Sequence, residues 1–142
     1  MLRVIDMLVV HCSATTPSMN IGREQIRSWH IDRGFSDIGY HYVIRRNGDL
    51  EMGRPLGRAG AHAKGFNAHS IGICLVGGID ETGRAVNNFT PAQWITLSFI
   101  IEGLKANFDL ADDNVWGHCD LPEVRKECPC FDVQAWLREY EV

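Results

Sequence analysis

The sequence lacks a hydrophobic run long enough to cross a membrane, an excess of positive charge, and any repeat or linker. Its net charge of −4 over 142 residues gives no support to nucleic acid as the main partner. The apolar opening segment is interrupted by Asp6, has no small-residue cleavage site and is too short for a transmembrane helix. We therefore expect no signal peptide, no membrane contact and no nucleic-acid partner.

Cysteines are few and odd in number. Five cysteines, at spacings that do not suggest a secreted disulfide framework, favour a protein kept in a reducing cytoplasm. Hydrophobic and charged contents of 45% and 23% are ordinary for a soluble globular chain and argue against disorder. The length is close to that of a common single domain, so we expect one domain over residues 1–142, and a monomer.

The tight cysteine pairs of structural zinc sites are also absent. Instead, two histidines far apart, His11 and His118, each end an apolar run, and cysteines follow the second one. Imidazole and thiolate are ligands that Zn²⁺ prefers, and three protein ligands leave a fourth position open for water, as in catalytic sites. We therefore predict a catalytic zinc site made by His11, His118 and one of Cys119, Cys128 and Cys130.

Strand and helix signals alternate along the chain. Apolar or alternating segments predict strands at residues 7–11, 40–44, 49–52, 70–76 and 114–117. Asn47-Gly48 is a strong hairpin signal between the second and third of these. Helices are predicted from an Asn20 cap to Arg33, from Thr90-Pro91 through residue 108, and after Asp132. The pattern predicts a mixed α/β (α+β) fold, with a central mixed β-sheet flanked by helices and the zinc in a groove at strand ends.

Short motifs spread in order over residues 7–136 carry a resemblance. The matching segments are Val10-His11-Cys12-Ser13-Ala14-Thr15, Gly39-Tyr40-His41-Tyr42-Val43-Ile44, Asn47-Gly48, Gly53-Arg54, His62-Ala63-Lys64-Gly65-Phe66-Asn67, Ser70-Ile71-Gly72-Ile73-Cys74-Leu75-Val76-Gly77-Gly78, Phe89-Thr90-Pro91-Ala92-Gln93, Gly117-His118 and Lys126-Glu127-Cys128-Pro129-Cys130-Phe131-Asp132. Together they resemble the zinc-dependent N-acetylmuramoyl-L-alanine amidases shared by phage lysozymes (endolysins) and peptidoglycan-recognition proteins, and most of all the small phage endolysins.

The resemblance implies one Zn²⁺ per chain, with His11, His118 and Cys128 as ligands, and it matches Tyr40 and Lys126 to the family's two catalytic side chains. The chemistry is consistent, because amide hydrolysis at a metal needs donors for the developing oxyanion and a proton for the leaving nitrogen. A tyrosine hydroxyl and a lysine ammonium beside the metal are groups of that kind.

Alternatives exist for two of these assignments. Cys119 and Cys130 are close rivals of Cys128, which is favoured by its place just before Pro129. Tyr42 is two residues after Tyr40 and is expected on the same strand face, so the choice of Tyr40 depends on the Gly-Tyr-His match.

Four further residues are expected to be packing or surface residues. Cys12 and Cys74 stand in apolar strands and are interpreted as small buried residues. His30 and His41 fall on a predicted helix and a predicted strand, and are interpreted as surface or core residues and not as ligands.

The loop over residues 53–67 has no clear period and is of the kind that carries function. Basic side chains in and before it suit the free carboxylates of peptidoglycan stems, which arginine binds bidentately. The candidates for substrate contact are His62, Asn67, Arg54 and Lys64.

The resemblance implies hydrolysis of the amide bond between N-acetylmuramic acid and L-alanine, by an enzyme that stays in the cytoplasm until it is released to the cell wall. Two alternatives remain: an amidase that recycles soluble anhydromuropeptides, and a non-catalytic peptidoglycan-binding module. The segment 119–125 is somewhat longer than in the compact phage form, which leaves stem-peptide preference open.

Overall fold

A mixed five-stranded sheet lies at the centre of the molecule, in the order β3-β2-β4-β1-β5. The computed structural model describes residues 3–122, 124 and 127–140. The strands are β1 (Met7–Cys12), β2 (Tyr42–Ile44), β3 (Leu50–Met52), β4 (Ser70–Leu75) and β5 (Val115–Gly117). β1 pairs in parallel with β4 and β5, β2 pairs in parallel with β4, and β3 runs antiparallel to β2. The predicted mixed sheet is confirmed, with strand ends shifted by one or two residues.

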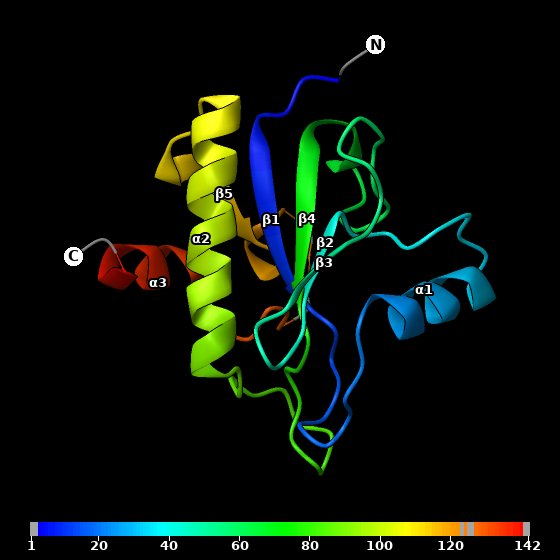
Figure 1. Ribbon diagram of the computed structural model, residues 1–142. Helices are drawn as coiled ribbons and strands as arrows, with labels where there is room; N and C mark the ends of the chain where they lie inside the picture. Colours follow the sequence, from blue (N-terminus) through cyan, green and yellow to red (C-terminus); the bar gives the residue numbers. More distant parts are fainter. Residues whose placement is uncertain (1–2, 123, 125–126, 141–142) are drawn as a thin grey trace.

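Helices cover both sides of the sheet. The α-helices are α1 (Arg23–Asp32), α2 (Pro91–Phe108) and α3 (Val133–Tyr140). Figure 1 shows α2 and α3 on one side of the strands and α1 on the other. The start of α2 is as predicted, with Thr90 at the N-cap and Pro91 in the first turn. Gln93 adds a reciprocal capping box with Thr90 that was not predicted. No helix in the described part of the chain is long and apolar enough to span a membrane.

The strands present two different faces because side chains alternate along them. One set packs under α2 and α3 in the largest apolar cluster, and we call it the helix-covered face: Leu8, Val10, Cys12, Tyr42, Ile44, Ile71, Ile73 and Leu75. The alternate positions of β1 and β4, with the residue that follows β5, form what we call the histidine face: Met7, Val9, His11, Ser70, Gly72, Cys74 and His118. Loops and α1, instead of a long helix, cover the histidine face.

The N-terminus of α1 differs from the prediction. The N-cap position is Gly22, not Asn20, and it makes no side-chain capping bond. The carboxylate of Glu51, from β3, accepts a hydrogen bond from the backbone N–H of Arg23 at 2.8 Å instead. A distant side chain therefore satisfies an N–H group that a local cap was expected to satisfy.

Candidate metal centre

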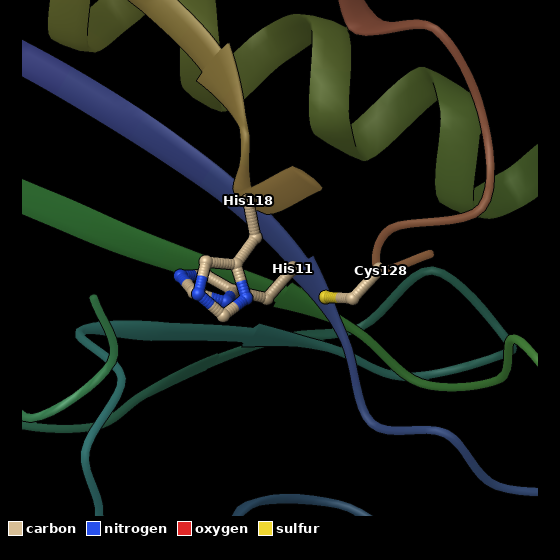
Figure 2. A group of neighbouring side chains, drawn as sticks. All are labelled: His11, His118 and Cys128. Atoms are coloured by element: carbon tan, nitrogen blue, oxygen red, sulfur yellow. The ribbon is translucent and has the colours of Figure 1, made fainter. Parts of the chain in front are cut away.

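His11 and His118 meet at the carboxyl ends of two neighbouring parallel strands. Val10 pairs with Gly117 across β1 and β5, so the next residue of each strand, a histidine, lies at the same edge of the sheet. The two imidazole ring centroids are 4.5 Å apart. Figure 2 shows both rings close to Cys128, which reaches in from the loop after β5. The ligand atoms of the three residues lie within 4.8 Å of one another.

A short set of hydrogen bonds holds the Cys128 loop against this edge. The backbone N–H of Cys119 donates to the carbonyl of Cys128 at 2.8 Å, and the N–H of Gly117 donates to Asp120 at 3.0 Å. The backbone N–H of Cys12 donates to the Cys128 sulfur at 3.1 Å. This hydrogen bond holds the Cys128 sulfur at the end of β1, beside His11.

The two rival cysteines have other partners. The thiol of Cys119 faces the carboxylate of Asp120 at 3.8 Å, and the thiol of Cys130 donates to the carbonyl of Gly78 at 3.3 Å. Burial raises the pKa of Cys130 to about 12, which keeps it a thiol at neutral pH. In the described part of the chain, Cys128 is the cysteine that joins both histidines in a group able to hold a metal.

Tyr40 lies beside the candidate metal ligands and Tyr42 does not. The Tyr40 ring is 5.1 Å from that of His11, measured between centroids. The expected shared face is wrong, since Tyr42 is buried on the helix-covered face while Tyr40 packs with the cluster on the opposite side. The reason is that the chain is still bent at His41, and regular alternation begins where β2 begins.

The Tyr40 hydroxyl is held in its protonated form. Burial, together with the neighbouring thiol of Cys74, raises the tyrosine pKa well above its ordinary value. The preceding backbone is fixed as well, because the N–H of Gly39 donates to His30 at 2.8 Å. The side chain, whose ring lies beside His11, therefore keeps its hydroxyl proton over the whole neutral pH range.

His62 also reaches the site from the 53–67 loop. Its Nδ1 lies 2.8 Å from the Nε2 of His11, and its Nε2 lies 3.2 Å from the hydroxyl of Ser70. Burial lowers the pKa of His62 to about 3, so the ring is neutral. Asn67 shapes the same loop, since its side-chain oxygen accepts from the backbone N–H groups of His62 and Ala63, both at 2.9 Å.

The two basic candidates of this region differ in environment. Arg54 is buried, and its guanidinium donates to the carbonyls of Ile38 at 2.6 Å and Ala59 at 3.0 Å. These bonds give Arg54 the task of holding the loop in shape. Lys64 is exposed and lines a groove that also includes His118, one of the candidate metal ligands.

The groove has a volume of about 710 Å³. Sequence reasoning missed two of its residues, Arg33 and Phe35, which flank the glycine that ends α1 and whose guanidinium and ring stack at 5.3 Å. Its lining includes Arg33, Phe35, His62, Lys64, Asn67 and His118. The remaining predicted catalytic residue, Lys126, lies outside the described residues.

Comparison with known proteins supports one family throughout. The family model for N-acetylmuramoyl-L-alanine amidase matches residues 1–131. The endolysin of Escherichia phage T7 is 44% identical over 137 residues, which cover 96% of this chain and 88% of that protein. A peptidoglycan-recognition protein of Drosophila melanogaster is 28% identical over 96% of this chain and 74% of its own length. Among solved structures, the N-acetylmuramoyl-L-alanine amidase LysC from Clostridium intestinale superposes with a TM-score of 0.79 at 29% identity, over 94% of this chain and 85% of that one.

Proposed function

The chain belongs to the N-acetylmuramoyl-L-alanine amidase family and is a peptidoglycan hydrolase, and we propose that it works as a zinc enzyme with His11, His118 and Cys128 as ligands. The observation that carries the proposal is the convergence of two imidazoles and one thiol within 4.8 Å at the edge of the sheet. Two histidines and a thiolate are a donor set that fits Zn²⁺ and leaves a position for water. When bound there, the ion would supply a Lewis acid for the scissile carbonyl and lower the pKa of water.

Tyr40 serves in the proposal as the donor to the oxyanion that develops on the scissile carbonyl. Support comes from its place 5.1 Å from His11, ring to ring, and from the burial that keeps its hydroxyl protonated. A preorganised donor of this kind acts in the transition state and not in the ground state. Lys126 is proposed as a second cationic group for the same charge or for the proton of the leaving nitrogen.

We propose that the muramyl peptide stem binds in the groove beside the ligands. Lys64 is exposed in its lining and is suited to a stem carboxylate, and Arg33 adds a second cation to the same lining. Asn67 acts by fixing the loop that carries Lys64. Arg54 is assigned no contact with the stem, because backbone carbonyls occupy its guanidinium.

The proposed target is intact cell wall. The enzyme is proposed to act as a monomer and to stay in the cytoplasm until lysis. The similarity to phage endolysins over most of the chain favours this role over recycling of soluble anhydromuropeptides. A thiol and a tyrosine at the site argue against a module that binds without cutting. Digestion of purified sacculi, followed by mass spectrometry of the released ends, tests the proposal. New L-alanine amino ends are expected, and soluble anhydro-fragments cut faster than sacculi would favour the recycling role.

Metal content is the second test. Purified protein is expected to contain about one Zn²⁺ per chain, as for a three-ligand site. Removal of the metal by a chelator should abolish clearing of sacculi, and added Zn²⁺ should restore it. Full turnover by metal-free protein would overturn the zinc proposal.

A further inference from the structure

His62 is the middle member of a hydrogen-bonded chain of three side chains, His11, His62 and Ser70, that begins at a proposed metal ligand. Both ring nitrogens of His62 make a hydrogen bond: Nδ1 with Nε2 of His11 at 2.8 Å, and Nε2 with the hydroxyl of Ser70 at 3.2 Å. The His11 and His62 rings meet edge to face, at an interplanar angle of 89° and a centroid distance of 4.9 Å. Ser70 is fully buried at the start of β4, so the far end of the chain is fixed by the sheet.

The sheet is shaped to receive this ring. Gly72 stands in the middle of β4, where glycine weakens a strand unless something approaches closely. A Cβ atom on Gly72 would lie 2.6 Å from Cγ of His62, and one on Gly60 would lie 2.7 Å from its Cδ2. Two glycines therefore leave the space that the imidazole fills, which indicates a position specified by the fold.

The direction of the hydrogen bonds has a consequence for His11. A neutral imidazole has one donor and one acceptor nitrogen. If Nδ1 of His62 donated, Nε2 of His11 would accept, and the proton of His11 would sit on Nδ1, so that neither nitrogen could offer a lone pair to a metal. If Nδ1 of His62 accepts, Nε2–H of His11 donates and Nδ1 is the ligand atom. The second arrangement is completed when Nε2–H of His62 donates to Ser70.

We infer that His62 is a positioning residue that holds His11 in the tautomer whose Nδ1 binds the metal, with Ser70 anchoring the far end of the chain. The inference rests on the zinc site proposed above and gives His62 a role toward the metal in place of a contact with substrate. Partners of this kind orient metal-binding histidines, and their loss typically lowers metal affinity about 10–100-fold.

Zinc affinity of the full chain, measured without substrate by competition with a chromophoric chelator, tests the inference. His62→Phe keeps a ring in the space but removes both hydrogen bonds, and we expect its Kd for Zn²⁺ to rise about 10–100-fold. His62→Asn places an amide oxygen where Nδ1 stands, so it should recover most of the affinity. His69→Phe is the matched control, because His69 lies in the same region but bonds to the exposed Asp6.

A spectroscopic measurement on the wild-type protein keeps the test independent of how the variants fold. Long-range ¹H–¹⁵N spectra of the zinc-loaded chain should show His11 protonated at Nε2 and metal-bound at Nδ1. A His11 bound through Nε2 would overturn the inference. So would a His62→Phe variant with wild-type zinc affinity and a raised KM alone, which would make His62 a substrate contact. Wild-type protein that binds no zinc would overturn the proposed metal site itself, an outcome distinct from both.

Discussion

The two faces of the sheet are made from the same strands and do different work. Alternate residues of β1 supply Leu8 and Val10 to the helix-covered face and Val9 and His11 to the histidine face. The first face is continuous and apolar beneath α2 and α3. The second carries two small apolar clusters that surround a polar centre. The difference teaches that one strand can serve two purposes: one set of residues packs the core, and the set between them carries the proposed metal site.

The contrast between the faces leads to an experimental rule. Substitutions on the histidine face should change metal binding or turnover, and those on the helix-covered face should change the free energy of unfolding. The rule is tested with pairs of variants. In some pairs one substitution lies on each face, and in others one lies at the proposed site and one beside it; equal effects within a pair would contradict the rule.

Loss of a metal ligand should have the largest effect. Cys128→Ser is expected to lose bound zinc and to reduce clearing of sacculi below detection, because it removes the thiolate of the site. Cys119→Ser and Cys130→Ser are the controls, since their thiols face Asp120 and Gly78. Zinc content by mass spectrometry and activity are measured together. If Cys130→Ser were the variant that loses zinc, the ligand assignment would be wrong.

The two tyrosines test the faces directly. Tyr40→Phe should lower kcat about 10²–10³-fold, the usual cost of one lost oxyanion donor, with zinc content and binding to sacculi unchanged. Tyr42→Phe lies on the helix-covered face and should keep normal kcat. Steady-state kinetics and a pull-down on sacculi separate turnover from binding. Equal losses in both variants would show that the face does not decide the role.

Shortening a core side chain that packs on the helix-covered face should lower the free energy of unfolding without changing zinc affinity. Leu97 of α2 is fully buried and belongs to the apolar cluster on the helix-covered face. Leu97→Ala should lower the free energy of unfolding by about 2–5 kcal/mol, through lost burial and the cavity left behind. Denaturant unfolding is measured in the presence of a chelator, and zinc affinity is measured separately. A large change in zinc affinity would mean that the faces are coupled.

Acid should lower the free energy of unfolding through His41, a buried residue that belongs to neither of the two named faces. His41 accepts from the N–H of Gly72 and donates to the carbonyl of Arg58, and burial lowers its pKa from 6.5 to about 4. Between those values the unfolded chain binds the proton that the folded chain refuses. Stability is therefore fully present above pH 6.5 and falls as the pH drops toward 4, by at most about 3 kcal/mol for this group.

The measurement is the pH dependence of unfolding in chelator-treated protein, for wild type and His41→Gln. The variant has a lower stability throughout, so the slope is compared and not the absolute value. His62 has a pKa lowered in the same direction and adds to the slope of both proteins. An unchanged slope in His41→Gln would contradict the prediction.

Much of this arrangement could be predicted from the sequence, and the reason is locality. The α2 start follows from Thr90-Pro91, a capping hydroxyl next to a proline that suits the first turn of a helix. The meeting of His11 with His118 also follows, because each ends a strand and parallel strands end at one edge. The prediction that Cys12 and Cys74 are buried is confirmed, and His30 and His41, which the sequence left as surface or core residues, are both buried.

The failures all involve partners distant in the sequence. The cap of α1 comes from the carboxylate of Glu51, which lies 28 residues from Arg23 in the sequence. The separation of Tyr40 from Tyr42 depends on a bend at His41, which faces Gly72 across the sheet. A period of two holds only after pairing begins, so alternation could not be extended back to residue 40.

The central place of β1 has a consequence for synthesis of the chain. β1 is made before the other strands, yet it lies between β4 and β5, and β5 follows it by about 100 residues. At a translation rate of ~5–20 residues per second, the edge of β1 that pairs with β5 waits roughly 5–20 s for its partner, and the edge that pairs with β4 waits a shorter time. The segment Met7–Cys12 carries no charge to discourage pairing with another nascent chain. We expect the yield of soluble protein to fall when many copies of the chain are synthesised close together, because exposed β1 segments can then pair with one another. A lower expression level at lower temperature should favour the native sheet over such aggregates.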